Sequence, residues 1–142
     1  MRILGLDVGD KRIGVAVSDE MGWTAQPVKV IQRQARAQDL KAVAQLVKSY
    51  QAQKVVVGLP RNMNGSLGPQ AGKAQDFGQD LAGLIGAEVV FWDERLSTVA
   101  AERVLLAADL SRAKRKKVVD KVAAGFILQG YLDHLLYKKA GQ

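Results

Sequence analysis

The sequence predicts an α/β fold in which helices cover both faces of a mixed sheet. Two observations support this prediction. Three short runs before residue 34 alternate in polarity like β-strands, and stretches of helical period then alternate with apolar β-like runs. A strand meander followed by such alternation is typical of a mixed sheet flanked by helices. With 142 residues, 48% of them hydrophobic, residues 1–142 suit one domain with its own core.

The first two strands are expected to form a hairpin. The run RILGLDVG alternates in polarity and carries one carboxylate, Asp7. A short polar turn leads to a second alternating run, RIGVAVSD, and a third strand is expected around PVKVIQR. An even-length turn pairs Val8 with Ile13 and sets Asp7 opposite Gly14. A glycine at that position leaves open space beside the carboxylate.

Helices and strands alternate in the rest of the chain. Apolar residues with helical spacing predict helices over 40–50 and 74–84. The apolar runs KVVVGLP and AEVVFWDE predict strands, and the first is continuous enough to be covered on both faces. Ser97 or Thr98 can cap a helix that continues through Leu105. A long apolar helix is expected from about Val118 to Tyr137.

Composition excludes several classes of protein. There is no cysteine, which excludes a disulfide framework and a thiolate metal site, and a single histidine argues against a histidine zinc cluster. No apolar run reaches about 18 residues, so no membrane span is expected. The amino terminus lacks the regions of a signal peptide. These features predict a soluble cytoplasmic protein.

The net charge of +7 indicates a polyanionic partner, and most of the excess lies in one segment. The stretch SRAKRKKVVDK carries six basic residues and one acid. One interpretation is a solvated loop and helix start. The other is a patch that contacts phosphates of a nucleic acid. Its candidate contact residues are Arg112, Lys114, Arg115, Lys116 and Lys117.

Acidic residues occur where the strands of such a sheet end, which is where open α/β sheets place their sites. Asp7 lies near the end of the first strand, and Asp93 and Glu94 end the last one. Alternation puts Asp93 and Glu94 on opposite faces of their strand. Only one of them can share a face with Asp7, and periodicity does not say which.

A third acid, Asp120, lies on the long helix. Positions four, seven and eleven residues after it are Ala124, Ile127 and Tyr131, so Asp120 lies on a packed stripe. A carboxylate directed at a sheet is costly unless it is paired or bound to metal. Helix-start acids also benefit from the helix dipole, which is a purely structural reason for Asp120.

Together, Asp7, Glu94 and Asp120 form a candidate catalytic and metal-binding set. Carboxylates without His or Cys favour Mg²⁺ or Mn²⁺, and two such ions about 4 Å apart would activate a water and stabilise the leaving oxygen of a phosphoryl displacement. Structural alternatives exist: Asp7 as a turn residue and Glu94 as an ion-pair partner. Cations near these acids could hold phosphates. They are Lys11, Arg12, Arg95 and the basic segment.

Four motifs, taken together, resemble one family. They are GLDVGDKRIGVAVSD, VVVGLPRNMNGSLGP, FWDERLSTVAAERVL and DKVAAGFILQGYLD. They are similar to the bacterial YqgF family, also called RuvX, whose members are described as Holliday junction resolvases or pre-16S ribosomal RNA nucleases. The resemblance covers nearly the whole chain. It implies a ribonuclease H-like fold, a five-stranded mixed sheet in βββαβαβα order with helices on both faces.

The resemblance also implies roles for residues. Asp7, Glu94 and Asp120 would be the catalytic acids, which favours Glu94 over Asp93. The substrate groove would be lined by Lys11, Arg12, Asn62, Asn64, Gly65 and Arg95. Two positions depart from the family pattern. Ser97 stands where threonine is common, and Arg61 stands where an apolar residue is expected.

The leading hypothesis is a metal-dependent nuclease, a hydrolase that trims the 5′ end of precursor 16S ribosomal RNA in ribosome biogenesis. One alternative is a resolvase of four-way DNA junctions, which would act as a symmetric pair. Another is an RNA-binding ribosome-assembly factor without catalysis. The first motif also resembles the phosphate loop of actin-like ATPases, but 142 residues are too few for their two domains. RNA or DNA as substrate, and monomer or homodimer as assembly, stay open.

Overall fold

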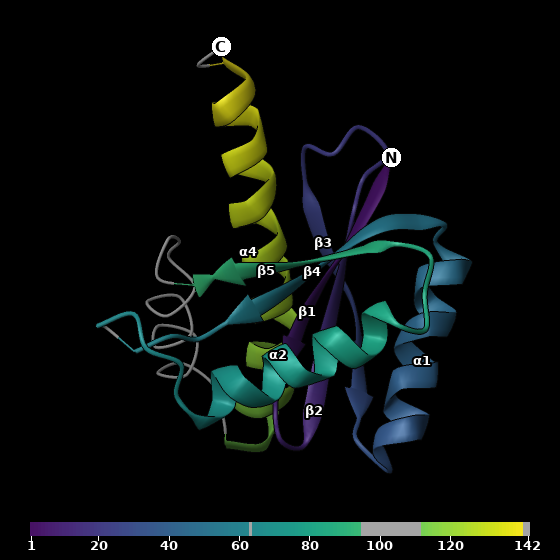
Figure 1. Ribbon diagram of the computed structural model, residues 1–142, viewed down its shortest axis with the longest axis vertical. Helices are drawn as coiled ribbons and strands as arrows, with labels where there is room; N and C mark the ends of the chain where they lie inside the picture. Colours follow the sequence, from purple (N-terminus) through teal and green to yellow (C-terminus); the bar gives the residue numbers. More distant parts are fainter. Residues whose placement is uncertain (63, 95–111, 141–142) are drawn as a thin grey trace.

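The computed structural model describes the backbone of residues 1–62, 64–94 and 112–140, and their side chains except those of 112–121 and 139–140. In these residues one mixed sheet has the strand order β3-β2-β1-β4-β5 (Figure 1). The strands are β1 (Arg2–Val8), β2 (Arg12–Ser18), β3 (Ala25–Gln32), β4 (Ala52–Leu59) and β5 (Glu88–Asp93). The first three form an antiparallel meander, and β4 and β5 run parallel to β1. The predicted five-stranded mixed sheet is confirmed.

Helices cover both faces of this sheet, as predicted (Figure 1). The helices α1 (Arg36–Ser49) and α2 (Pro69–Ala82) lie on one face and α4 (Arg112–Ala140) lies on the other. One buried cluster joins α1 and α2 to the strands, and its largest buried side chain is Phe77. A second cluster joins Ile127 and Leu128 of α4 to the opposite face. Among the described residues, no helix is long and apolar enough to span a membrane.

The β1–β2 hairpin has the register that its turn length predicts. Val8 pairs with Ile13, and Asp7 lies opposite Gly14. The Gly9 amide donates to the Arg12 carbonyl at 2.8 Å and closes the turn. A Cβ on Gly9 would lie 3.0 Å from that same oxygen, so this turn closes tightly only with glycine. Asp7 lies just before this turn, near the carboxyl end of the sheet's central strand.

The last helix differs from the prediction at its start. It begins at Arg112 and not near Val118, so residues 112–121 of the basic segment are helical and do not form a loop before the helix. Lysine and arginine are good helix formers, while apolar periodicity marks only the part of a helix that packs. The pattern therefore located the packed part of α4 and missed its first turns. The helix predicted from Ser97 or Thr98 through Leu105 lies outside the described residues.

Candidate active site

The carboxyl ends of β1, β4 and β5 meet at one edge of the sheet because these strands are parallel. Asp7 is the last residue but one of β1 and is half-buried. Asp93 ends β5, and Glu94 follows directly. The structure therefore brings the predicted strand-end acids to the same edge.

Glu94, and not Asp93, shares a face with Asp7. Ile3 packs against α4, and the alternation of β1 puts Asp7 on that same face. A Cβ built on Gly58 of β4 would lie 3.1 Å from Glu94 Oε2 and 2.5 Å from Ile127 Cδ1 of α4. The Glu94 carboxylate therefore lies under α4, and Glu94 is 4% exposed.

Asp93 lies on the opposite side of β5. Its neighbour Phe91 packs against the cluster that contains α1 and α2. The Asp93 Oδ2 atom is 3.9 Å from Arg61 Nε, and the Asp93 side chain is 18% exposed. The structure thus shows which of the two acids lies on the face of Asp7, a choice that the sequence pattern alone left open.

The third acid, Asp120, lies within α4, one turn before Ala124. The stripe predicted to follow it is buried: Ala124 and Ile127 are 0% exposed and Tyr131 is 7% exposed. The side chain of Asp120 lies outside the described residues, as do Arg95 and the side chains of the basic segment (Arg112, Lys114, Arg115, Lys116 and Lys117). The backbone places residues 112–121 of the basic segment in the same helix as Asp120.

A cavity of about 410 Å³ adjoins Asp7. Its walls come from the end of β1 and from the segment between β4 and α2, namely Asp7, Val8, Gly9, Pro60, Asn62, Gly68, Pro69 and Gln70. The predicted groove residue Asn62 is part of this lining. Asn64 and Gly65, which were predicted with it, are not among the lining residues.

The loop that carries Asn62 is braced by its own hydrogen bonds. Asn62 Nδ2 donates to Ser66 Oγ at 3.0 Å, and Asn64 Oδ1 accepts from the Ser66 amide at 3.0 Å. Arg61 Nη1 donates to the Gly65 carbonyl at 3.0 Å. Arg61, one of the two residues that depart from the expected family pattern, therefore shapes the loop and lies beside Asp93.

The turn between β1 and β2 carries the predicted phosphate contacts. Lys11 is exposed and Arg12 is partly buried. Sequence reasoning missed what holds this turn from the side of α2. Asp10 accepts hydrogen bonds from Gln70 Nε2 at 2.8 Å and from Lys73 Nζ at 3.0 Å. No local pattern indicates these contacts, because the partners lie 60 and 63 residues away.

The Asp10 contact has a measurable consequence. The hydrogen bond from Lys73, with that from Gln70 and the charge of Lys73, holds the pKa of Asp10 below its usual 3.8. In Lys73→Met we expect an NMR titration to show a higher Asp10 pKa. Because the folded-state pKa is lowered, any stability from this contact is present above the unfolded-state pKa and is lost as pH falls through the folded-state value. Lys54→Met, which removes a lysine near Glu88, should leave the Asp10 pKa unchanged, and an unchanged value in Lys73→Met would contradict the contact.

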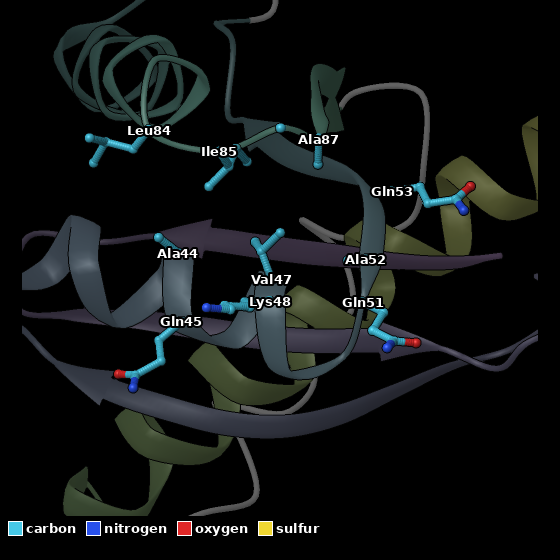
Figure 2. Close-up of a pocket in the computed structure, with 11 residues that line it drawn as sticks. Ala44, Gln45, Val47, Lys48, Gln51, Ala52, Gln53, Leu84, Ile85 and Ala87 are labelled. Atoms are coloured by element: carbon cyan, nitrogen blue, oxygen red, sulfur yellow. The ribbon is translucent and has the colours of Figure 1, made fainter.

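A larger cavity, of about 730 Å³, lies at the opposite end of β4 and β5 (Figure 2). Figure 2 shows Val47 of α1 and Ile85 pointing towards each other across it. Its lining residues are Ala44, Gln45, Val47, Lys48, Gln51, Ala52, Gln53, Leu84, Ile85, Gly86 and Ala87. None of these residues carries a carboxylate, whereas Asp7 lines the smaller cavity.

The described acids suit a hard divalent cation. Their donors are carboxylate oxygens, which Mg²⁺ and Mn²⁺ prefer. At Gly58 the absence of a Cβ lets Ile127 of α4 and the Glu94 carboxylate both pack closely against β4. Within the described side chains, no group of three or more His, Cys, Asp and Glu residues forms a metal site. By donor chemistry Asp7 and Glu94 are suited to hold such a cation, and the side chain of Asp120 lies outside the described residues.

Comparison with known proteins gives a consistent result. A family model described as "RuvX: Holliday junction resolvase" matches residues 1–134. A Clostridium tetani protein is 55% identical over 97% of this chain and all of its own length, and a Moorella thermoacetica protein is 60% identical over 95% of this chain and 96% of its own. Both carry the name "Putative pre-16S rRNA nuclease".

A likeness to a solved structure supports the same fold. The structure "T. thermophilus RuvC in complex with Holliday junction substrate" has a TM-score of 0.63 and 17% identity over 100% of this chain and 97% of that one. At this identity the likeness concerns the fold alone. The ribonuclease H-like sheet that the motifs implied is confirmed.

Proposed function

Because the chain belongs to the RuvX family, we propose that it is a nuclease that hydrolyses phosphodiester bonds of precursor 16S ribosomal RNA. One observation carries the proposal: Asp7 and Glu94 share the α4 face at the carboxyl edge of the sheet, and Asp7 opens into a cavity. The names of the relatives support an RNA substrate. Such a substrate implies a cytoplasmic protein.

In the proposed mechanism, Asp7, Glu94 and Asp120 would hold Mg²⁺ or Mn²⁺. Two such ions, when bound, would supply an activated water and charge stabilisation for the leaving oxygen. The chain orients the substrate. Burial of Glu94 limits the water around its carboxylate, and the Asn62 loop bounds the cavity beside Asp7. A preorganised site of this kind lowers the barrier because its groups need no rearrangement during the reaction.

Cations of the chain would bind the phosphates on either side of the scissile bond. Lys11 is the last residue of the turn between β1 and β2, and Arg12 is the first residue of β2. The first turns of α4 carry Arg112, Lys114, Arg115, Lys116 and Lys117 in the helix of Asp120, and Arg95 follows Glu94 in the sequence. Positive charge therefore accompanies each proposed acid along the chain, as a polyanionic substrate requires.

This electrostatic role predicts a defined salt dependence. The double variant Lys116→Ala/Lys117→Ala should bind single-stranded RNA more weakly, and its plot of log K against log salt should be shallower by about 1.4, because each lost phosphate contact removes about 0.7 from the slope. Fluorescence anisotropy in EDTA measures binding without cleavage. The control Lys41→Ala/Lys48→Ala removes two charges from α1, on the other face, and should keep the wild-type slope. Equal slopes for both variants would contradict the assignment.

The substrate is tested with three labelled nucleic acids, with and without Mg²⁺ or Mn²⁺. They are an RNA that spans the 5′ end of 16S ribosomal RNA, the same sequence as DNA, and a four-way DNA junction. We expect metal-dependent cleavage of the RNA. If the protein cleaves none of the three substrates, the proposal is overturned. Binding without cleavage would indicate an assembly factor.

The family description and the fold support one second candidate, a resolvase of four-way DNA junctions. A resolvase cuts two strands in a symmetric pair and so needs two copies of the chain. Paired cuts in the junction, together with a homodimer in size-exclusion chromatography, would favour the resolvase. A monomer that cuts only RNA would exclude it.

A further inference from the structure

The turn between β1 and β2 is held by a partly buried ion pair that lies outside the cavity. Arg33 follows β3, and Asp39 lies in the first turn of α1. Arg33 Nε is 3.1 Å from Asp39 Oδ2, and the two side chains are 18% and 3% exposed. The second carboxylate oxygen, Oδ1, accepts from the Gln34 amide at 2.8 Å. Asp39 is thus fixed through both oxygens, and it fixes the Arg33 guanidinium in turn.

Arg33 contacts the β1–β2 turn at two points. Its Nη1 donates to the Gly9 carbonyl at 2.9 Å, and its backbone amide donates to the Lys11 carbonyl at 2.9 Å. The guanidinium lies over the Phe77 ring, 5.4 Å from the ring centroid, which limits its movement. The two carbonyls flank Asp10, and Gly9 is two residues from Asp7. Arg33 therefore connects the α1–α2 face of the sheet to the segment that carries the proposed reactive acid.

We infer that Arg33, oriented by Asp39, is a positioning residue for Asp7. Arg33 does not line the cavity beside Asp7, so Arg33 acts through the Gly9 carbonyl and not on the substrate. The contact is directional, because one guanidinium uses Nε for Asp39 and Nη1 for Gly9. A lysine keeps the charge but has a single ammonium, which cannot replace both contacts with the same geometry. The inference rests on the proposed nuclease function.

Arg33→Lys tests this inference, with Arg36→Lys as the matched control. Arg36 pairs with Asp80 at the exposed surface between α1 and α2, so the same substitution there leaves the turn untouched. For Arg33→Lys we expect kcat for RNA cleavage to fall about ten- to a hundredfold at nearly unchanged KM, because a displacement of about 1 Å at a reacting group has effects of this size. Arg36→Lys should retain the wild-type kcat.

A second readout does not depend on catalysis. In the metal-free protein, Arg33→Lys should shift the NMR amide resonances of Asp7, Val8 and Gly9, and Arg36→Lys should not. Asp39→Asn should lower kcat as Arg33→Lys does, and the double variant Arg33→Lys/Asp39→Asn should be little worse than either one, because the two residues act as a unit.

The outcomes separate this inference from the proposed function. A wild-type protein that cleaves none of the substrates overturns the proposed function. If the wild type cleaves, three results overturn the inference while the function stands: an unchanged kcat in Arg33→Lys, a raised KM at unchanged kcat, and a lower melting temperature with no change in the Asp7 resonances. Reduced kcat together with shifted Asp7 resonances supports it.

Discussion

Asp7→Asn is expected to lower the rate of RNA cleavage by about a thousandfold or more and to leave RNA binding intact. Asparagine keeps the shape of the side chain and one carbonyl oxygen but removes the charge that a divalent cation requires. Metal ions contribute several kcal/mol of transition-state stabilisation, and about 1.4 kcal/mol corresponds to a tenfold change in rate. Single-turnover cleavage at fixed Mn²⁺ measures the chemical step, and binding in EDTA is measured separately.

Two neighbouring acids provide the matched comparison. Glu94→Gln should resemble Asp7→Asn, since both acids lie on the face that α4 covers. Asp93→Asn makes the same chemical change one residue away but on the other face, beside Arg61, and should retain cleavage. If Asp93→Asn lost activity and Glu94→Gln kept it, the reactive face of the sheet would be the one covered by α1 and α2.

The hairpin at Asp7 could be predicted in detail because its determinants are local. Alternation fixed the face of each residue, and the length of the turn fixed the register, so the pairing of Asp7 with Gly14 followed from a few residues. The helix–strand alternation gave the layers for a similar reason. Each amphipathic segment has one face to bury, and a mixed sheet offers both of its faces.

The choice between Asp93 and Glu94 required contacts that no local pattern contains. Periodicity separates the two acids but does not say which face of β5 meets α4. That depends on Trp92, whose ring packs edge-on against Tyr131 with centroids 6.0 Å apart, across 39 residues of sequence. The Asp10 contact with Lys73 is likewise long-range. The candidate acids could thus be selected from the sequence, while the face of the sheet on which each one lies depended on tertiary packing.

Gly5→Ala is expected to destabilise the protein by about 2–3 kcal/mol, the usual cost of overpacking a tight core contact. Gly5 lies in the middle of β1 and is buried beneath α4. A Cβ there would lie 2.7 Å from Leu128 Cβ and 3.1 Å from the Ala124 carbonyl oxygen. Neither atom can rotate away, because one is fixed to the helix backbone and the other is part of it. The backbone of the helix or of the strand must therefore shift at this contact.

Gly72→Ala is the matched control, since Gly72 is an interior glycine of α2 with nothing within 4 Å of a built Cβ. Alanine is a better helix former, so this variant should gain about 0.5–1 kcal/mol. Urea unfolding followed by circular dichroism measures both free energies of unfolding, and unchanged m-values would confirm that the unfolding transition is comparable. A Gly5→Ala protein as stable as the wild type would contradict the close packing of α4 on β1.

The same contact links stability to the proposed chemistry. Gly5 precedes Asp7 by two residues, and Ala124 follows Asp120 by one helical turn, so their contact sets how near α4 approaches the strand that carries Asp7. Moving the helix away should also separate these two segments. A Gly5→Ala protein that stays folded at low temperature should therefore cleave RNA more slowly per folded molecule. The Gly72→Ala protein should keep the wild-type rate. A folded Gly5→Ala protein with full activity would show that the site tolerates movement of α4, and Asp120 would then be a weak candidate for the third acid.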